Sequence, residues 1–234
     1  MVVLTRTDIQ IAGMDATQWD GGNRALLAVH GSEGNRTDPI ISTVARAAAS
    51  TGITTVSIDL PGHGTRKDTH RLNPWNAGAE IRDSFEYLRT NFTDVNVFGC
   101  SLGTYFSICA LSEAPVSGAL FLAPLLDMRP IIESRLATAG ISLEQLKESS
   151  ITQLPGGGTL EWEYVNYVLT HPPRWKHRTH ILRGKRDYLT SSEGAQKFTD
   201  ATKGTLVEVD AAHYFHTSEE LDWIRAWVTK SLKQ

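Results

Sequence analysis

Four short apolar runs stand out within residues 1–124. They are ALLAVH (25–30), ITTVSIDL (53–60), VNVFGC (95–100) and SGALFLAP (117–124). Short apolar runs that are rich in β-branched side chains are typical of strands buried on both faces of a parallel sheet. We therefore expect these four segments to be core strands.

Between these runs the apolar residues change to helical spacing. Asp38 and Pro39 form an N-cap and first-turn pair, and the apolar face that follows consists of Ile41, Val44, Ala45 and Ala48. A second helix is indicated by apolar residues at spacings of four, three and four, namely Ile81, Phe85, Leu88 and Phe92. Alternating strands and helices predict an α/β fold with a doubly wound, mostly parallel sheet and helices on both faces.

The alternation stops after residue 124. Residues 125–176 contain Ser142-x-x-Gln145, which predicts a capping box, followed by the glycine-rich LPGGGTL and the aromatic-rich LEWEYVNYVLTHPPRW. This composition is typical of an insertion rather than of a core layer. We expect a core of residues 1–124 and 177–234, with residues 125–176 inserted into it.

The core pattern resumes beyond the insertion. THILRG (179–184) and TLVEVDA (205–211) predict two further strands. Thr190-x-x-Glu193 and Thr217-x-x-Glu220 predict capping boxes that open the helices after these strands.

Composition excludes several classes of function. The chain has 234 residues, 41% of them apolar, and a net charge of −3. Its basic residues are scattered and outnumbered by acidic ones, so we expect no nucleic-acid partner. No run of about 18 apolar residues and no signal-peptide pattern is present, so we expect no membrane span and a cytoplasmic protein. No segment indicates a particular oligomeric state.

The segment Gly99-Cys100-Ser101-Leu102-Gly103 matches the pattern G-x-S-x-G where a buried strand meets a helix. At such a turn a strained serine projects its hydroxyl above the sheet edge, and the next N–H, that of Leu102, points toward a developing oxyanion. The alternative is an ordinary strand-to-helix turn, where glycine and serine are common.

A serine hydroxyl is a weak nucleophile near neutral pH, so a catalytic serine needs a base, an orienting carboxylate and a second oxyanion donor. The donor is expected in VHGSEG (29–34), from the N–H of Ser32 or, less favoured, that of Glu33. His30 in the same segment is expected to be a structural hydrogen-bonding residue.

The carboxylate and the base each have two candidates. Asp187 follows the strand 179–184, and its rival Asp127 stands at the start of the insertion. His213 follows the last strand, and its rival His216 lies three residues further on. The spacing HYFH lacks a third nearby ligand, so we expect neither a metal nor another cofactor.

The order Ser101, Asp187, His213 is the nucleophile, acid and base order of the α/β-hydrolase superfamily. The chain resembles that superfamily over nearly its whole length, through HGSEG, DLPGHG (59–64), GCSLG, GKRD and AAH. The resemblance implies a serine hydrolase with residues 125–176 as a small lid. Serine at position 101 argues against haloalkane dehalogenases and epoxide hydrolases, which use aspartate there.

The resemblance favours a carboxylesterase that cleaves small or medium acyl esters. Four lid aromatics are candidates for an acyl pocket: Trp162, Tyr164, Tyr167 and Trp175. A carbon–carbon bond hydrolase, a thioesterase and a cofactor-free haloperoxidase-like enzyme would use the same triad, and a catalytically silent ligand-binding protein is the alternative outside enzymes.

Overall fold

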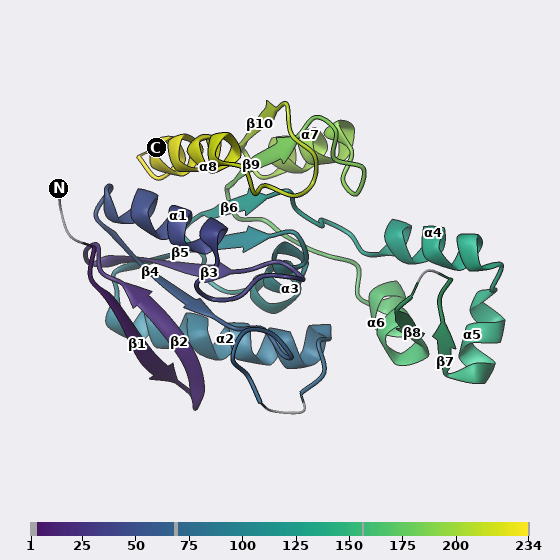
Figure 1. Ribbon diagram of the computed structural model, residues 1–234. Coiled ribbons are helices and arrows are strands. Elements are labelled where there is room, and N and C mark those ends of the chain that lie inside the picture. Colours follow the sequence, from purple (N-terminus) through teal and green to yellow (C-terminus); the bar gives the residue numbers. More distant parts are fainter. Residues whose placement is uncertain (1–3, 68–69, 156, 234) are drawn as a thin grey trace.

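The computed structural model describes residues 4–67, 70–155 and 157–233, and its centre is an eight-stranded sheet (Figure 1). The strands are β1 (Arg6–Ile11), β2 (Met14–Trp19), β3 (Arg24–Val29), β4 (Ile53–Ile58), β5 (Asp94–Cys100), β6 (Ala119–Leu122), β9 (Thr179–Gly184) and β10 (Thr205–Val209). Their order is β1-β2-β4-β3-β5-β6-β9-β10. The predicted α/β fold is therefore confirmed.

All neighbours from β4 to β10 are parallel, and β3, β4 and β6 are buried almost throughout, as their continuous apolar runs predict. β1 and β2 form an antiparallel hairpin that pairs with β4, which the pattern of apolar runs does not predict. β1 is mostly exposed and carries charged and polar residues, so it has no apolar run to mark it.

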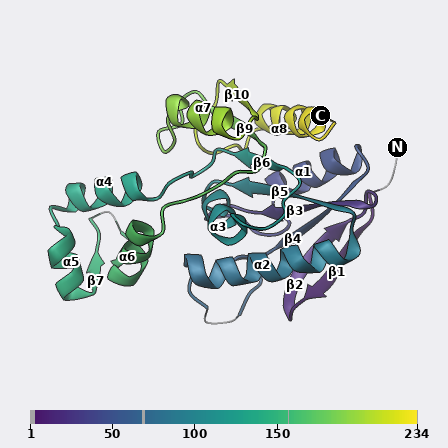
Figure 2. The ribbon, with the colours of Figure 1, turned by 180° about the vertical axis from the view of Figure 1, so that it is seen from behind.

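Helices cover both faces of the sheet (Figures 1 and 2). α1 (Pro39–Ala49) and α8 (Ser218–Ser231) pack together on one face, whereas α2 (Pro74–Asn91), α3 (Leu102–Leu111) and α7 (Ser192–Ala201) contribute to the core on the other. The Asp38 side chain accepts a hydrogen bond from the Ile41 N–H at 2.8 Å, and Thr217 and Glu220 form the predicted capping box. These caps begin α1 and α8 at the expected positions.

The expected capping box at Thr190 is wrong by one residue. Ser191 is the N-cap of α7 and accepts a hydrogen bond from the Gly194 N–H at 3.0 Å. The Thr190 hydroxyl donates instead to the carbonyl of Pro124. Thr190 thus joins the loop after β9 to the end of the β6 segment, a long-range contact that local spacing does not report.

Residues 125–176 form a group of elements to one side of the core (Figures 1 and 2). They are α4 (Arg129–Ala139), α5 (Leu143–Ser149), the hairpin of β7 (Ile151–Gln153) and β8 (Thr159–Glu161), and α6 (Trp162–Thr170). The capping box of Ser142 and Gln145 begins α5 as predicted. Buried residues of this group, including Ile132, Leu136, Leu146 and Val165, join the larger core cluster. We call residues 125–176 the inserted segment.

No helix in the described ranges is long and apolar enough to cross a membrane.

Candidate active site

The parallel strands β5, β9 and β10 end at the same edge of the sheet, and a candidate residue follows each of them. The Ser101 Oγ lies 2.8 Å from His213 Nε2, and His213 Nδ1 lies 2.9 Å from Asp187 Oδ2. His213 and Asp187 are 4% and 7% exposed, so the hydrogen bond between them is shielded from water. The fold thus brings together three residues that are far apart in sequence.

The two rivals lie outside this chain of hydrogen bonds. The side chain of His216 is 78% exposed, and its Nδ1 lies 3.2 Å from the Tyr214 carbonyl oxygen. Asp127 is exposed and accepts a hydrogen bond from the Arg129 N–H at 2.9 Å, at the start of α4. The geometry therefore favours His213 and Asp187 as the partners of Ser101.

The backbone at Ser101 is in a strained conformation, with φ 48° and ψ −117°. This residue is the N-cap of α3, so the N–H of Leu102 opens the helix. A Cβ on Gly99 would lie 2.7 Å from Thr104 Cα, and one on Gly103 would lie 2.3 Å from the His30 carbonyl oxygen. Both glycines are needed because strand, turn and helix approach so closely, and strain of this kind is typical of functional turns.

The carboxyl group of Asp187 is held in its charged form. Burial opposes ionisation, but the hydrogen bond and charge of His213, together with backbone N–H groups including that of Leu189, outweigh it and lower the pKa of Asp187. The Leu189 N–H donates to Asp187 Oδ1 at 2.9 Å. An ionised Asp187 accepts from His213 Nδ1, which leaves Nε2 as the acceptor that faces Ser101.

Arg183, on β9, supports the loop that carries Asp187 and was not singled out from the sequence. Its side chain is 3% exposed, and Nη2 donates to the carbonyl oxygens of Asp187 at 3.0 Å and Thr190 at 2.8 Å. Nη1 makes an ion pair with Glu208 on the neighbouring strand β10. A buried guanidinium with several donors can satisfy two loop carbonyls at once.

The loop of residues 30–34 lies beside Ser101. A Cβ on Gly31 would lie 3.3 Å from the Ser101 Cβ, so this loop passes directly beside the serine. His30 is fully buried, with Nδ1 donating to the Gly31 carbonyl at 2.7 Å and Nε2 accepting from the Leu60 N–H at 3.0 Å. This pattern fits a neutral imidazole, and burial lowers the pKa of His30 to about 4. His30 therefore has the structural role expected of it.

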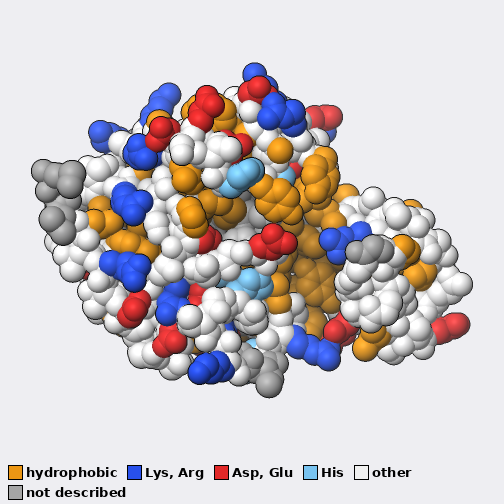
Figure 3. Space-filling view, viewed as in Figure 1, with side chains coloured by type: hydrophobic (Ala, Val, Ile, Leu, Met, Phe, Trp, Pro, Cys, Tyr) orange, Lys and Arg blue, Asp and Glu red, His pale blue; other side chains and the backbone are white. Residues whose placement is uncertain are grey.

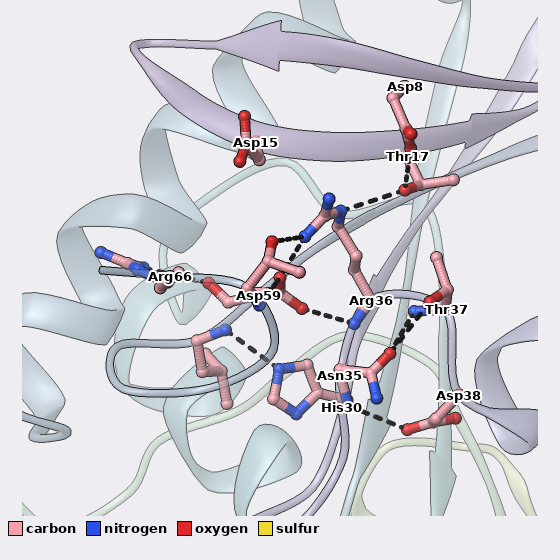
Figure 4. A network of polar contacts seen from close by, with 12 residues as sticks. Asp8, Asp15, Thr17, His30, Asn35, Arg36, Thr37, Asp38, Asp59 and Arg66 are labelled. Atoms are coloured by element: carbon pink, nitrogen blue, oxygen red, sulfur yellow. Dashed lines mark hydrogen bonds and ion pairs between the residues drawn. The ribbon is translucent and has the colours of Figure 1, made fainter. Parts of the chain in front are cut away.

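Asp59, the first residue of DLPGHG, holds the chain just beyond this loop (Figure 4). It is 2% exposed, accepts a hydrogen bond from the Arg36 N–H at 2.7 Å and makes an ion pair with the Arg36 guanidinium. The Nε of Arg36 donates to Thr17 on β2 at 3.2 Å, so the network reaches the N-terminal hairpin. A Cβ on Gly64 would overlap the Asp59 carboxyl group, which explains the last glycine of the motif.

Cys100 does not resemble a nucleophile. Its side chain lies in a buried core cluster, and burial together with the charge of Asp38 raises the pKa of its thiol to about 12. Both Cys100 and Cys109 are free cysteines.

Two cavities meet at Ser101 and His213. The main cleft, of about 750 Å³, runs from these residues to the inserted segment, and its apolar wall includes Leu102, Phe106, Leu125, Met128, Ile132 and Leu189. The small cavity, of about 240 Å³, lies against the 30–34 loop and includes Ile40, Ile41, Leu122 and Phe215. Ser32 and Tyr214 border both cavities.

Of the four aromatic residues expected in an acyl pocket, Tyr164 lines the main cleft. The other three are not among the residues that border it. Trp162 packs on the core cluster, Tyr167 stacks on His171, and Trp175 packs on Phe121 and donates to Thr179. The cleft is instead bordered by Trp75, in the first turn of α2, and by the exposed Tyr188 and Tyr214. Sequence reasoning missed these residues because their segments are adjacent only in the folded chain.

Among the described residues, no three His, Cys, Asp or Glu side chains are arranged to hold a metal ion. The expectation of no cofactor stays a prediction.

The fold and the site together define a class: a mostly parallel α/β protein with a serine, a histidine and a carboxylate hydrogen-bonded at the carboxyl ends of its strands. A family model described as the alpha/beta hydrolase family matches residues 26–219, and the chain belongs to that family. Comparison with curated protein sequences finds no match.

Solved structures with the same fold include hydrolases and esterases. Est1E from Butyrivibrio proteoclasticus, with ferulic acid bound, has a TM-score of 0.73 and 18% identity over 97% of this chain and 100% of that one. A putative hydrolase from Agrobacterium vitis has a TM-score of 0.76 and 16% identity over 99% and 100%. An esterase from Pyrococcus furiosus has a TM-score of 0.68 and 16% identity over 98% and 90%. At these identities the likeness establishes the fold.

The first testable prediction concerns His30 and pH. Because the pKa of His30 in the folded protein is about 4, the folded protein binds fewer protons at this residue than the unfolded chain between about pH 6.5 and pH 4. The free energy of unfolding therefore decreases as the pH is lowered through that window. Lowering the pH from 7 to 5 should decrease the free energy of unfolding by about 2 kcal/mol through His30 alone. Urea unfolding at several pH values should show a shallower loss in His30→Gln. The control is His171→Gln, an exposed histidine; equal pH dependence in wild type and His30→Gln would refute the assignment.

The second prediction concerns Arg183. Arg183→Met leaves two loop carbonyls without their donor and should lower the unfolding free energy by about 3 kcal/mol. The downfield proton NMR signal of the His213 Nδ1–H should also weaken as the Asp187 loop loses support. The control Arg186→Met removes an exposed ion pair with Asp210 and should cost less than about 1 kcal/mol. Similar losses in the two variants would contradict the supporting role.

Proposed function

We propose that this member of the hydrolase family is a serine carboxylesterase that cleaves small or medium acyl esters through Ser101, His213 and Asp187. The observation that carries the proposal is the continuous pair of hydrogen bonds from Ser101 Oγ through His213 to Asp187. The strained turn at Ser101 adds support, because it exposes the hydroxyl at the junction of two cavities.

In the first half-reaction the Ser101 Oγ attacks the ester carbonyl carbon while His213 Nε2 takes the hydroxyl proton. The carbonyl oxygen becomes an oxyanion that accepts hydrogen bonds from the N–H groups of Leu102 and Ser32. His213 then gives its proton to the leaving alkoxide, the carbon–oxygen bond of the ester breaks, and an acyl group remains on Ser101.

In the second half-reaction water attacks the acyl carbon, and His213 again takes and returns a proton. The acid product leaves and Ser101 is regenerated. Asp187 keeps the imidazole in the required tautomer and stabilises its positive charge in both steps. This role agrees with the lowered pKa of Asp187, which keeps the carboxylate charged near neutral pH.

The two cavities agree with an ester as substrate, because an ester has two organic parts on either side of its carbonyl carbon. The main cleft, of about 750 Å³, has room for the larger part, and the small cavity of about 240 Å³ for the smaller. Among the structural neighbours, Est1E has ferulic acid, an aromatic acid, bound, and the Pyrococcus furiosus protein is an esterase, which also favours an acyl substrate. The inserted segment, which borders the main cleft, acts as a lid in this proposal.

The proposal is tested by labelling with a fluorophosphonate and by hydrolysis of 4-nitrophenyl butyrate. We expect the wild type to be labelled and active, and Ser101→Ala to be neither. Asp187→Asn should lower kcat by about 10⁴-fold, and His213→Ala by at least as much, because each removes a part of one proton-transfer unit.

The matched controls are Asp127→Asn and His216→Ala, which replace the exposed rivals and should retain most activity. The assignment of roles would be contradicted if one of these controls lost its activity while Asp187→Asn or His213→Ala kept it. Hydrolysis confined to thioesters or to carbon–carbon bonds in a substrate panel would contradict the ester as substrate, and an unlabelled wild type would contradict a catalytic role for Ser101.

A further inference from the structure

The main cleft is apolar near Ser101 but charged where the inserted segment borders it. In Figure 3, apolar side chains gather in the groove between the core and the inserted segment, and both basic and acidic side chains lie at its edges. The charged residues that line the cleft are Arg71, Arg135 and Glu161, which gives this lining a net charge of +1. An unbalanced charge beside an apolar surface favours a ligand of opposite charge. The ion pairs among these three side chains therefore show which charge is left for a ligand.

Two of the three charges neutralise each other. Arg71 Nη1 lies 2.7 Å from Glu161 Oε1 across the cleft rim. Arg135, on α4, makes no ion pair or hydrogen bond with any part of the chain that the structure describes. Its neighbour on the same helix, Arg129, is instead paired with Glu133 at 3.2 Å. Arg135 is thus the cationic side chain of the cleft that has no anion beside it.

A second polar group in the same cleft also lacks a partner. Tyr164, on α6, lines the cleft, and within the described ranges its hydroxyl makes no hydrogen bond. Burial and the neighbouring Cys109 raise the pKa of Tyr164, whereas the positive charge of Arg135 acts to lower it. A guanidinium and a neutral phenol together present N–H and O–H donors, and they have no acceptor of their own.

We propose that Arg135 and Tyr164 bind an anionic group, a carboxylate, at the end of the substrate that lies away from the scissile ester. The apolar wall between this pair and Ser101 accommodates the hydrocarbon part that separates the two groups. The preferred substrates are therefore esters that carry a free acid, such as half-esters of dicarboxylic acids. This inference rests on the proposed esterase function and specifies its substrate class.

The test compares mono-(4-nitrophenyl) adipate with 4-nitrophenyl hexanoate, which has the same chain length but no carboxylate. We expect the wild type to favour the adipate half-ester in kcat/KM, and this preference to decline as salt is added. Arg135→Met should lower the ratio of the two kcat/KM values about tenfold, mainly through KM, since a charge-assisted hydrogen bond is lost. Tyr164→Phe should lower the ratio less, because it removes a neutral donor.

The matched control is Arg129→Met, which removes the same charge from the same helix and should leave the ratio unchanged. A second pair of substrates, 4-carboxyphenyl hexanoate and 4-carbamoylphenyl hexanoate, places the carboxylate on the alcohol part instead. If Arg135→Met changes the kcat/KM ratio of the first pair of substrates, the acyl part of the ester occupies the main cleft. If it changes the ratio of the second pair, the alcohol part does. A ratio that is the same in wild type, Arg135→Met and Arg129→Met for both pairs would overturn the inference.

Binding to Ser101→Ala separates this inference from the proposed function. Calorimetry with monophenyl adipate, a slowly reacting half-ester, should show binding to Ser101→Ala that weakens about tenfold when Arg135→Met is added. Arg135-dependent binding without Ser101-dependent hydrolysis would refute the esterase proposal and support the anion site. If Ser101 hydrolyses the ester but Arg135→Met changes neither the kcat/KM ratio nor the binding, the esterase proposal is supported and the anion site is refuted.

Discussion

The contact between Ser101 Oγ and His213 Nε2 joins residues that are 112 positions apart, and the other features of the site depend on it. It exists because β5 and β10 are parallel members of one sheet and end at the same edge. A buried arginine and a buried, neutral histidine keep the neighbouring loops in place. Arg183 holds the carbonyls of the Asp187 loop, and His30 holds the loop beside Ser101. The position of the catalytic candidates is thus determined by the sheet and by hydrogen bonds from buried side chains to backbone.

The core strands, the elbow at Ser101 and the order of the three candidate residues could be predicted from sequence, because each is marked by a local pattern. The hairpin β1–β2 could not, since β1 is polar and mostly exposed and β2 mixes polar with apolar residues, so neither strand contains an apolar run. The choices between Asp187 and Asp127 and between His213 and His216 stayed open for another reason. Spacing along the chain does not report which side chain is buried next to Ser101, and in the structure the two rivals are exposed.

The residues that shape the cleft were the hardest to predict. Aromatic content alone indicated four residues of the inserted segment, but Trp175 is used for packing on Phe121, and Tyr167 stacks on His171. Arg135 and Arg71 look alike in sequence, and only the fold pairs Arg71 with Glu161 and leaves Arg135, among the described residues, unpaired in the cleft that Tyr164 also lines. The substrate preference we propose therefore follows from which charges remain unpaired after folding, and not from composition.

In the proposed reaction Ser101 carries the acyl group of the substrate during turnover. The most direct measurement is intact-protein mass spectrometry of the enzyme quenched with acid during hydrolysis of a slowly deacylated ester. We expect a mass increase of one acyl group, located at Ser101 by peptide mapping and absent in Ser101→Ala. An adduct at another residue, or turnover in Ser101→Ala at the rate of the wild type, would contradict it.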